Sequence, residues 1–223
     1  MKSKLLIAAI AAGFCLFQWS PAAQAQSQAQ SDDVPKFEIG VQFTSITKPD
    51  YNGGATEPGF GGRFTFNLSK SIALEAEGNF FPHNCGFCGS EGDNNGNITQ
   101  GLFGIKAGKR FRKWGLFAKA RPGVVSFSQG DPKYVSLGGG NFAFSHNRLT
   151  HFAADVGAVL EFYPSKHLVT RFDGGDTIIH YGARASNFLT FPTLTGPPVL
   201  VPFTVPASTR HNFQFAAGVG WRF

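Results

Sequence analysis

The sequence has 223 residues; 42% are hydrophobic, 14% are aromatic, and 20 basic against 14 acidic residues give a formal net charge of +6 at pH 7. The basic residues do not gather in one patch but alternate with apolar residues, which argues against a nucleic-acid-binding protein. After the N-terminal region no run reaches the about 18 consecutive apolar residues of a membrane-spanning helix, so no such helix is expected.

The N-terminus has the features of an export signal. Lys2 and Lys4 supply positive charge, residues 5–17 form an apolar stretch, and Ala23-Gln24-Ala25 is a small-x-small cleavage pattern. The apolar stretch is shorter than the about 20 residues that span a membrane. We therefore expect a signal peptide over residues 1–25, a mature chain that begins at Gln26, a linker over residues 26–35 and one domain over residues 36–223.

Eight later segments alternate between apolar residues and polar or very small ones, which is the period of a β-strand. In the last segment the odd positions from Phe213 to Phe223 are apolar and the even positions are polar or small. A soluble sheet buries its apolar face against a second layer, whereas a transmembrane barrel turns that face toward lipid. The eight segments are residues 36–46, 59–68, 71–80, 99–111, 114–125, 151–163, 167–180 and 213–223.

A few positions break the alternation. Leu102 and Phe117 fall on the polar face, and Asp176 falls on the apolar face. For Asp176 we expect a bulge at Gly174-Gly175 that shifts the phase of the strand. Pro122 has no N–H group and would remove one donor from the ladder between neighbouring strands.

The connections between the eight segments alternate in length. Three of them hold only two or three residues, Ser69-Lys70, Arg112-Lys113 and Pro164-Ser165-Lys166, and the others are several times longer. Long loops on one rim and tight turns on the other are typical of an outer-membrane barrel, whereas an immunoglobulin-like sandwich has modest turns at both ends. The segment lengths also fit the about 9–11 residues of a tilted spanning strand.

In these features the chain resembles the OmpA-like family of eight-stranded outer-membrane β-barrels. The matching stretches are Ile72-Ala73-Leu74-Glu75-Ala76-Glu77-Gly78, Phe117-Ala118-Lys119-Ala120-Arg121-Pro122-Gly123, residues 155–164 and the last segment. The resemblance implies an all-β, antiparallel, up-and-down transmembrane barrel in the bacterial outer membrane, with short periplasmic turns and long extracellular loops. It also implies that Phe223 is part of the signal read by the barrel-assembly machinery. The peptidoglycan-binding domain of the family's best-known member has no counterpart here, so cell-wall tethering is not implied.

The polar faces carry charged residues that such a barrel would turn into its lumen. Six are acidic and seven are basic, and an eight-stranded barrel is just wide enough for side chains to fill it. We expect ion pairs that plug the lumen, because pairing makes buried charge tolerable. A charge-lined pore for ions or small solutes is the alternative. The residues are Glu38, Arg63, Glu75, Glu77, Lys106, Arg110, Lys119, Arg121, Asp155, Glu161, Arg171, Asp173 and Arg222.

The apolar faces are expected to meet lipid. An aromatic girdle belongs near the short-turn rim, where aromatic rings sit at headgroup level. Its expected members are Phe111, Trp114, Tyr163 and Trp221. The residues expected near mid-membrane are Phe64, Leu74, Ile105, Val156 and Val219.

Cys85-Gly86-Phe87-Cys88 lies in the second long connection. A C-x-x-C pattern can be a redox pair, half of a zinc site or a short disulfide. The redox motif is found in a βαβ context that this sequence lacks. Zinc usually takes four ligands, and only His83 lies close by. We expect a disulfide between Cys85 and Cys88, with no metal site and no cofactor.

No catalytic cluster is apparent. His151 and Asp155 share a strand face, but at about 3.3 Å per residue they stand about 13 Å apart, too far to act as members of one triad. His180, Ser186 and Asn187 gather near the last long connection without a His-x-Ser spacing. We expect no enzymatic activity, and a lipid-modifying enzyme is the more distant alternative.

The last long connection, residues 183–210, contains five prolines and the apolar run Val199-Leu200-Val201-Pro202-Phe203. It would either fold over, extend as a hairpin above the membrane, or present an adhesive surface to a partner or to lipopolysaccharide. The sequence thus predicts a structural or surface-interacting outer-membrane protein. Its expected contacts are membrane lipid, lipopolysaccharide, the barrel-assembly machinery during insertion and an extracellular partner of the loops.

Overall fold

The computed structural model describes residues 34–48, 55–82, 96–128, 130, 132–138, 141–190 and 199–223. They belong to one unit, Val34–Phe223. The predicted signal peptide and both loop cysteines, Cys85 and Cys88, lie outside the described residues. No helix in the described part of the chain is long and apolar enough to cross a membrane.

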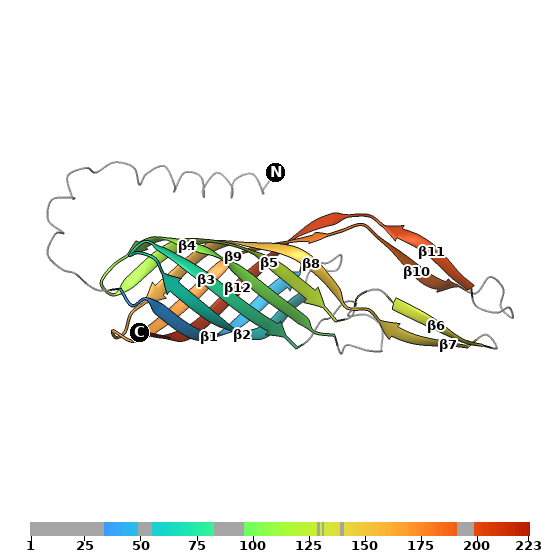
Figure 1. Cartoon of the computed structure of the whole chain (residues 1–223), viewed down its shortest axis with the longest axis horizontal. Helices are drawn as coiled ribbons and strands as arrows, with labels where there is room; N and C mark the ends of the chain where they lie inside the picture. Colours follow the sequence, from blue (N-terminus) through green and yellow to red (C-terminus); the bar gives the residue numbers. More distant parts are fainter. Residues whose placement is uncertain are drawn as a thin grey trace. The chain divides into compact units, whose positions relative to one another are not determined.

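Eight strands form a closed antiparallel barrel in the order β1-β12-β9-β8-β5-β4-β3-β2 (Figure 1). The eight alternating segments of the sequence are these eight strands, so the predicted fold class is confirmed. The strands are β1 (Phe37–Lys48), β2 (Ala55–Asn67), β3 (Ile72–Phe81), β4 (Ile98–Arg110), β5 (Trp114–Phe127), β8 (Leu149–Phe162), β9 (Leu168–Tyr181) and β12 (Ser208–Arg222).

Two further hairpins lie in long connections. β6 (Pro132–Gly138) pairs with β7 (Asn141–His146) between β5 and β8, and β10 (Arg184–Thr190) pairs with β11 (Val199–Val205) between β9 and β12. For the last connection, a hairpin was one of the expected arrangements; the first hairpin was not predicted. Both project from the end of the barrel opposite the short turns (Figure 1). We call the two ends the short-turn end and the long-loop end.

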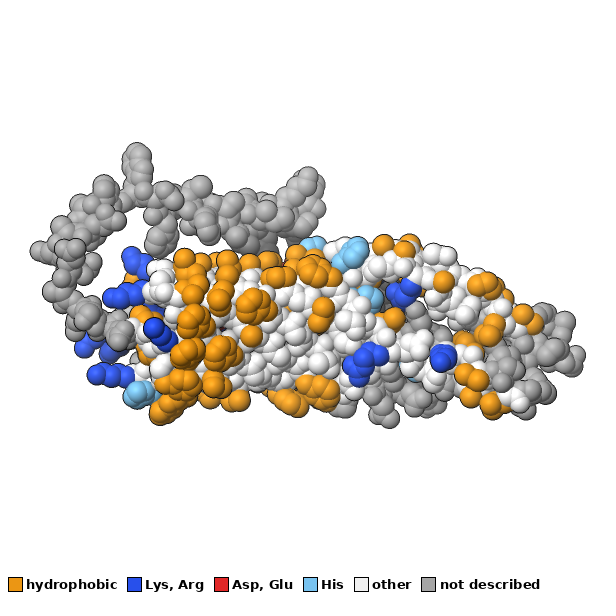
Figure 2. Space-filling view, in the orientation of Figure 1, with side chains coloured by type: hydrophobic (Ala, Val, Ile, Leu, Met, Phe, Trp, Pro, Cys, Tyr) orange, Lys and Arg blue, Asp and Glu red, His pale blue; other side chains and the backbone are white. Residues whose placement is uncertain are grey.

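Strict alternation gives the barrel two chemically different faces, because successive side chains of a strand point to opposite sides. Ile105 is 49% exposed and Val156 is 41% exposed, whereas their neighbours Lys106 and Asp155 are fully buried. On the face seen in Figure 2, hydrophobic side chains gather in a band over the part of the barrel toward the short-turn end, which we call the belt. Phe152 and Phe162 of β8 lie ten residues apart, which is about 33 Å along the strand and, at the about 40° tilt of such strands, about 25 Å across the membrane; this matches the apolar band of outer-membrane barrels. Phe64, Leu74 and Val219 also face outward.

The predicted bulge at Gly174-Gly175 is wrong. β9 pairs in unbroken register with both of its neighbours through these glycines. Asp176 therefore keeps its parity and lies on the outer surface, where its carboxylate stands 2.6 Å from Nδ1 of His211 and accepts a hydrogen bond from the backbone N–H of Asn212. An acid on the outer face thus finds polar partners on β12 without a change of register.

Pro122 lies where its missing N–H group matters. The pairing of β4 with β5 runs from Leu102–Gly123 directly to Ile105–Ala120, so it is interrupted at Pro122. On the other side, Pro122 stays in register with Ala154 of β8. The barrel absorbs the proline as a local gap in one ladder.

The seam of the barrel joins the first strand to the last. Phe37 and Phe223 exchange two backbone hydrogen bonds, each 3.0 Å long, and their ring centroids are 6.5 Å apart. The C-terminal residue therefore closes the sheet through its backbone in addition to presenting an aromatic side chain.

Deleting Phe223 and replacing it by alanine should have different effects. Deletion removes two backbone hydrogen bonds, each contributing about 0.5–1.5 kcal/mol, so the purified barrel should lose about 1–3 kcal/mol of unfolding free energy. Phe223→Ala keeps both bonds and should lower assembly in cells while the purified barrel stays near wild-type stability. Outer-membrane yield and urea unfolding in lipid vesicles measure the two effects; normal assembly of both variants at native expression would contradict the role of the aromatic ring.

An arginine on the belt should be far more harmful than the same change on a hairpin. Ile105→Arg should lower the free energy of unfolding by about 2–4 kcal/mol, the cost of a charge at the bilayer midplane. Leu137 of β6 is 68% exposed, and Leu137→Arg should stay within about 0.5 kcal/mol of wild type, as is usual for surface changes. Equal losses in vesicle-based unfolding would mean that the belt does not contact lipid.

Candidate functional site in the barrel interior

Inward-facing side chains fill the barrel in four levels from the short-turn end to the long-loop end. We call them the mouth, the charged level, the amide level and the apolar level. All thirteen charged residues expected in the lumen lie inside, in the first two levels. The levels differ in what holds them together, so each is described in turn.

The mouth is organised around Glu38 and Tyr163. Glu38 Oε1 accepts hydrogen bonds from Arg222 Nε at 3.3 Å and from Asn67 Nδ2 at 3.0 Å, and Arg110 Nη2 lies 3.6 Å away. The Tyr163 hydroxyl donates to a carboxylate oxygen of Glu161 at 2.8 Å and accepts from Arg110 Nε at 3.0 Å. Tyr163 directly follows β8. Its pKa is raised, mainly because the hydroxyl is buried and secondly because the carboxylate of Glu161 lies close by.

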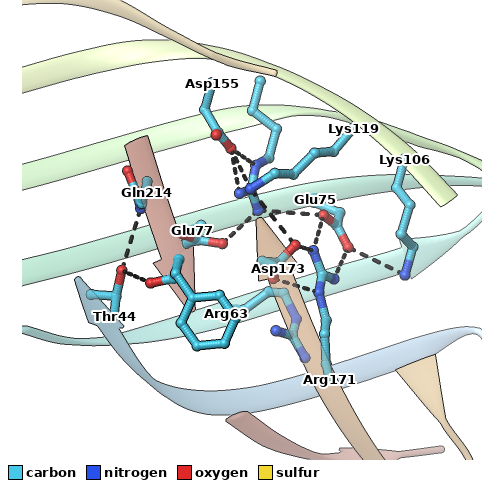
Figure 3. Close-up of polar contacts among 12 residues, drawn as sticks. Thr44, Arg63, Glu75, Glu77, Lys106, Lys119, Asp155, Arg171, Asp173 and Gln214 are labelled. Atoms are coloured by element: carbon cyan, nitrogen blue, oxygen red, sulfur yellow. Dashed lines mark hydrogen bonds and ion pairs between the residues drawn. The ribbon is translucent and has the colours of Figure 1, made fainter. Parts of the chain in front are cut away.

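Glu75 is the centre of the charged level (Figure 3). Both of its oxygens accept hydrogen bonds from Arg171, and it lies 3.3 Å from Lys106 Nζ and 3.5 Å from Arg121 Nη1. β3 and β9, which carry Glu75 and Arg171, are four strands apart in either direction around the barrel. The Arg171–Glu75 pair therefore spans the lumen from one wall to the opposite wall.

A second part of the charged level surrounds Asp155 and Arg121. These two face each other on adjacent strands, and Arg121 Nε donates to Asp155 Oδ2 at 2.9 Å. Lys119 Nζ reaches the same oxygen at 2.9 Å, and Arg121 Nη1 also donates to Glu77. Asp173 joins the two parts, because it accepts from Arg171 Nε at 2.8 Å and lies 3.7 Å from Lys119 Nζ.

Like charges also meet in this level. Lys106 and Lys119 are directly opposite each other on β4 and β5, an arrangement that would be unfavourable for an isolated pair. Each lysine turns to different acids: Lys106 to Glu75 and Glu161, Lys119 to Asp155 and Asp173. The charges are therefore balanced by the network as a whole and not by single cross-strand pairs.

Neutral side chains form the amide level above the charges. Gln100 and Gln214 donate to each other's carbonyl oxygens at 3.0 and 3.1 Å. Asn79 donates to Gln100 at 2.7 Å and accepts from Gln42 at 3.0 Å. Thr177 also donates to the Gln214 carbonyl at 2.6 Å. A continuous chain of hydrogen bonds thus satisfies these buried amides, as buried polar groups require.

The apolar level closes the stack at the long-loop end. Its members are buried and come from β1, β3, β4, β5, β8 and β9, with Tyr181 packed against them. A buried acid, Glu57 of β2, lies directly opposite Ile46 of this cluster. Its residues are Ile46, Phe81, Ile98, Val125, Phe127, Ala153 and Ile179.

Arg63 differs from the other buried bases. It donates Nη1 to Gln42 Oε1 at 3.2 Å, but its Nε and Nη2 have no hydrogen-bond partner among the described residues. Space for its side chain depends on a glycine of β1: a Cβ atom on Gly40 would lie 3.1 Å from Arg63 Nη2. A larger residue at Gly40 would compress this guanidinium group against the wall.

Sequence reasoning missed some interior residues. Glu57 is buried at the long-loop end of β2, with the same parity as Arg63, so alternation continued past Gly59 would have found it. Leu102 and Phe117, which broke the predicted pattern, are buried inside the barrel. Phe117 has a role there, because Lys106 Nζ lies 4.7 Å from the centre of its ring.

The residues of the expected aromatic girdle and His151 lie at different places in the barrel. Phe111 and Trp114 stack on the outer surface with ring centroids 4.2 Å apart, and Trp221 is exposed on β12. Tyr163, in contrast, turns into the mouth. His151 packs against the ring of Tyr181 at 4.6 Å.

The structure also shows where the candidate residues near the last long connection lie. His180 Nδ1 lies 3.1 Å from the hydroxyl of Thr209 on the next strand. Ser186 and Asn187 lie on β10, where they pair with Phe203 and Pro202 of β11. Hairpin pairing therefore accounts for the positions of these two residues.

Removing Glu75 should be severely destabilising. Glu75→Ala removes one of the acids that hold Arg171, Lys106 and Arg121, and breaking a buried pair by removing one partner costs about 3–5 kcal/mol. Asp176→Ala removes an acid from an exposed pair and should cost at most about 1 kcal/mol. Unfolding of both variants in lipid vesicles gives the comparison; similar losses would show that the charged level does not hold the barrel together.

Similar proteins are found by comparing structures and not by comparing sequences. No protein-family model matches the chain, and no curated protein is similar to it in sequence. Neisserial surface protein A has a similar structure, with a TM-score of 0.51 and 11% identity over 84% of this chain and 97% of that one. Ail, the attachment invasion locus protein of Yersinia pestis, gives a TM-score of 0.43 with 12% identity over 85% and 99% of the two chains. The N-terminal β-barrel domain of Pseudomonas aeruginosa OprF gives 0.39 with 12% identity over 82% and 97%. The chain has the eight-stranded outer-membrane β-barrel fold.

Proposed function

We propose that this protein is an integral barrel of the bacterial outer membrane, with a structural or surface-interacting role and a lumen closed to solutes. The belt of outward apolar side chains supports the location, because it has the height of an outer-membrane apolar band. The observation that carries the closed lumen is the stacking of a charged, an amide and an apolar level inside one narrow barrel.

Each level opposes passage for a different physical reason. Arg171 and Glu75 bridge opposite walls, so an ion would have to break a buried pair. The amides already satisfy one another, so a passing polar solute gains no new hydrogen bonds there. The seven apolar side chains of the apolar level offer no polar partner to an ion that has lost its water, and Glu57 is the buried acid described beside them. A narrow pore would need all three levels to rearrange.

A non-catalytic role is supported by the contacts that the candidate acid, Asp155, and the candidate base, His151, already make with other side chains. Asp155 is held by Arg121 and Lys119, and His151 packs against Tyr181 and Phe127. Asp155 and His151 therefore do not act together as an acid–base pair.

The long-loop end supports a surface interaction. Val135 and Leu137 of β6 and Val199 and Phe203 of the second hairpin are exposed apolar residues beyond the barrel. Lysines and arginines also lie near this end, among them Lys133 and Arg210. We infer that the hairpins contact lipopolysaccharide or an extracellular partner, with membrane lipid around the belt and the barrel-assembly machinery engaged only during insertion.

Planar-bilayer recording tests the closed lumen. The wild-type protein should give no steady single-channel steps. A variant of the charged level, Glu75→Ala with Arg171→Ala, should also stay closed, because the apolar level is intact. Adding Phe81→Ala and Phe127→Ala in the apolar level and Gln100→Ala and Gln214→Ala in the amide level should then produce conductance, since all three levels are weakened. Steady steps from the wild type would contradict the proposal and favour the narrow pore.

A further inference from the structure

On the described barrel, acidic side chains lie almost entirely inside, whereas basic side chains lie both inside and outside. Every described acidic side chain is buried except Asp176, which lies on the outer face of β9. Basic side chains, in contrast, are exposed at the short-turn end, where Figure 2 shows lysine and arginine beside the hydrophobic belt. We call this set the basic rim; its members are Lys36, Lys70, Lys109, Arg112, Lys113 and Lys166.

The short turns hold these bases at their tips. In the turn after β2, the hydroxyl of Ser69 accepts hydrogen bonds from the backbone N–H groups of Ser71 and Ile72, which leaves Lys70 exposed. Ser165 does the same for His167 and Leu168, and Lys166 is exposed at that tip. The same serine-lysine device thus recurs in two turns.

The third turn carries two bases. The backbone N–H of Phe111 donates to the carbonyl of Trp114 at 2.7 Å, so Arg112 and Lys113 form the tip. Lys109, on the outer face of β4, places its Nζ 5.5 Å from the centre of the Phe111 ring. All three turns therefore present positive charge, and none of the described residues at this rim is an exposed acid.

The rim adjoins the lipid-facing surface without a gap. Trp114 and Trp221 are exposed on the belt, and Trp221 stacks on His167 with ring centroids 5.4 Å apart. A molecule that touches both features needs an anionic head and apolar chains at the depth of the belt. A soluble acidic partner would meet the bases but not the rings.

We propose that the basic rim binds the phosphate groups of anionic glycerophospholipids in the periplasmic leaflet of the outer membrane. The inference rests on the proposed function, together with the expected orientation in which the short turns face the periplasm. Lysine and arginine stems can lie along apolar surface while their charged ends reach the headgroup level. Each base near an anionic lipid surface strengthens binding by about fivefold, so a rim with several bases and no exposed acid favours anionic over zwitterionic lipid.

Tryptophan quenching by brominated lipids measures this preference at the rim. Trp114 and Trp221 are the tryptophans outside the predicted signal peptide. The purified protein is placed in vesicles of phosphatidylcholine that contain a fraction of dibrominated phosphatidylglycerol or dibrominated phosphatidylcholine. The wild type should bind phosphatidylglycerol at least about fivefold more strongly in low salt.

A matched pair of variants localises the effect. The rim variant Lys70→Gln, Lys113→Gln, Lys166→Gln removes one base from each turn and should lower the preference at least about fivefold, with Lys36, Lys109 and Arg112 giving what preference is left. The control variant Lys133→Gln, Arg148→Gln, Arg210→Gln removes the same charge from exposed positions outside the rim and should keep the wild-type preference. An unchanged preference in the rim variant would overturn the proposal.

The remaining outcomes are also decisive. Quenching by brominated phosphatidylcholine with no preference for phosphatidylglycerol would overturn the inference and leave the proposed function standing. Absence of quenching by either lipid would contradict membrane insertion itself. If the rim variant does not insert, a wild-type preference that persists in 1 M salt overturns the proposal, because screening should abolish it. Lysine-dependent sedimentation with cell-wall sacculi, without a lipid preference, would assign the rim to a different anionic partner.

Discussion

The closure of the sheet between β1 and β12 is the constraint on which the rest of the structure depends. A closed sheet has no unpaired edge, and with eight strands its interior is only wide enough for side chains. Everything on the inner face must therefore pack against something else on the inner face. This condition explains why long basic side chains occur beside glycines such as Gly40: the wall must recede where a guanidinium group enters.

Within that space, the arrangement of charge is collective. The direct cross-strand neighbours include a favourable pair, Arg121 with Asp155, and an unfavourable one, Lys106 with Lys119. Such an interior is stable because acids from several strands share each base, and because the bond between Glu75 and Arg171 crosses the full width of the lumen. Buried charge is costly wherever a partner is missing. Arg63 has two buried nitrogens without a hydrogen-bond partner among the described residues, whereas Glu38, Arg110 and Asp155 each have one such atom.

Sequence alone was sufficient for the number of barrel strands and for the inward or outward direction of most side chains. Both follow from a period of two, which is a local property of each strand. Partner choice could not be predicted, because Glu75 and Arg171 meet across the lumen and no local rule links β3 to β9. The apolar level was also missed, since Phe81, Ile98 and Phe127 lie at strand ends, where the inward-facing positions are apolar instead of polar. Asp176 was misassigned to a bulge because its partner, His211, lies on a strand far along the chain.

The seam between Phe37 and Phe223 has a consequence for the timing of assembly. These residues pair across almost the entire described chain, and contacts between such distant positions form late because a long loop must first be closed. Until the last strand arrives, the inner face cannot be sealed, and its acids and bases remain hydrated and free to exchange partners. Desolvation of the network and completion of the sheet are therefore one cooperative event. A nascent chain stalled before its final strand would lack not only one-eighth of the wall but the whole dry interior.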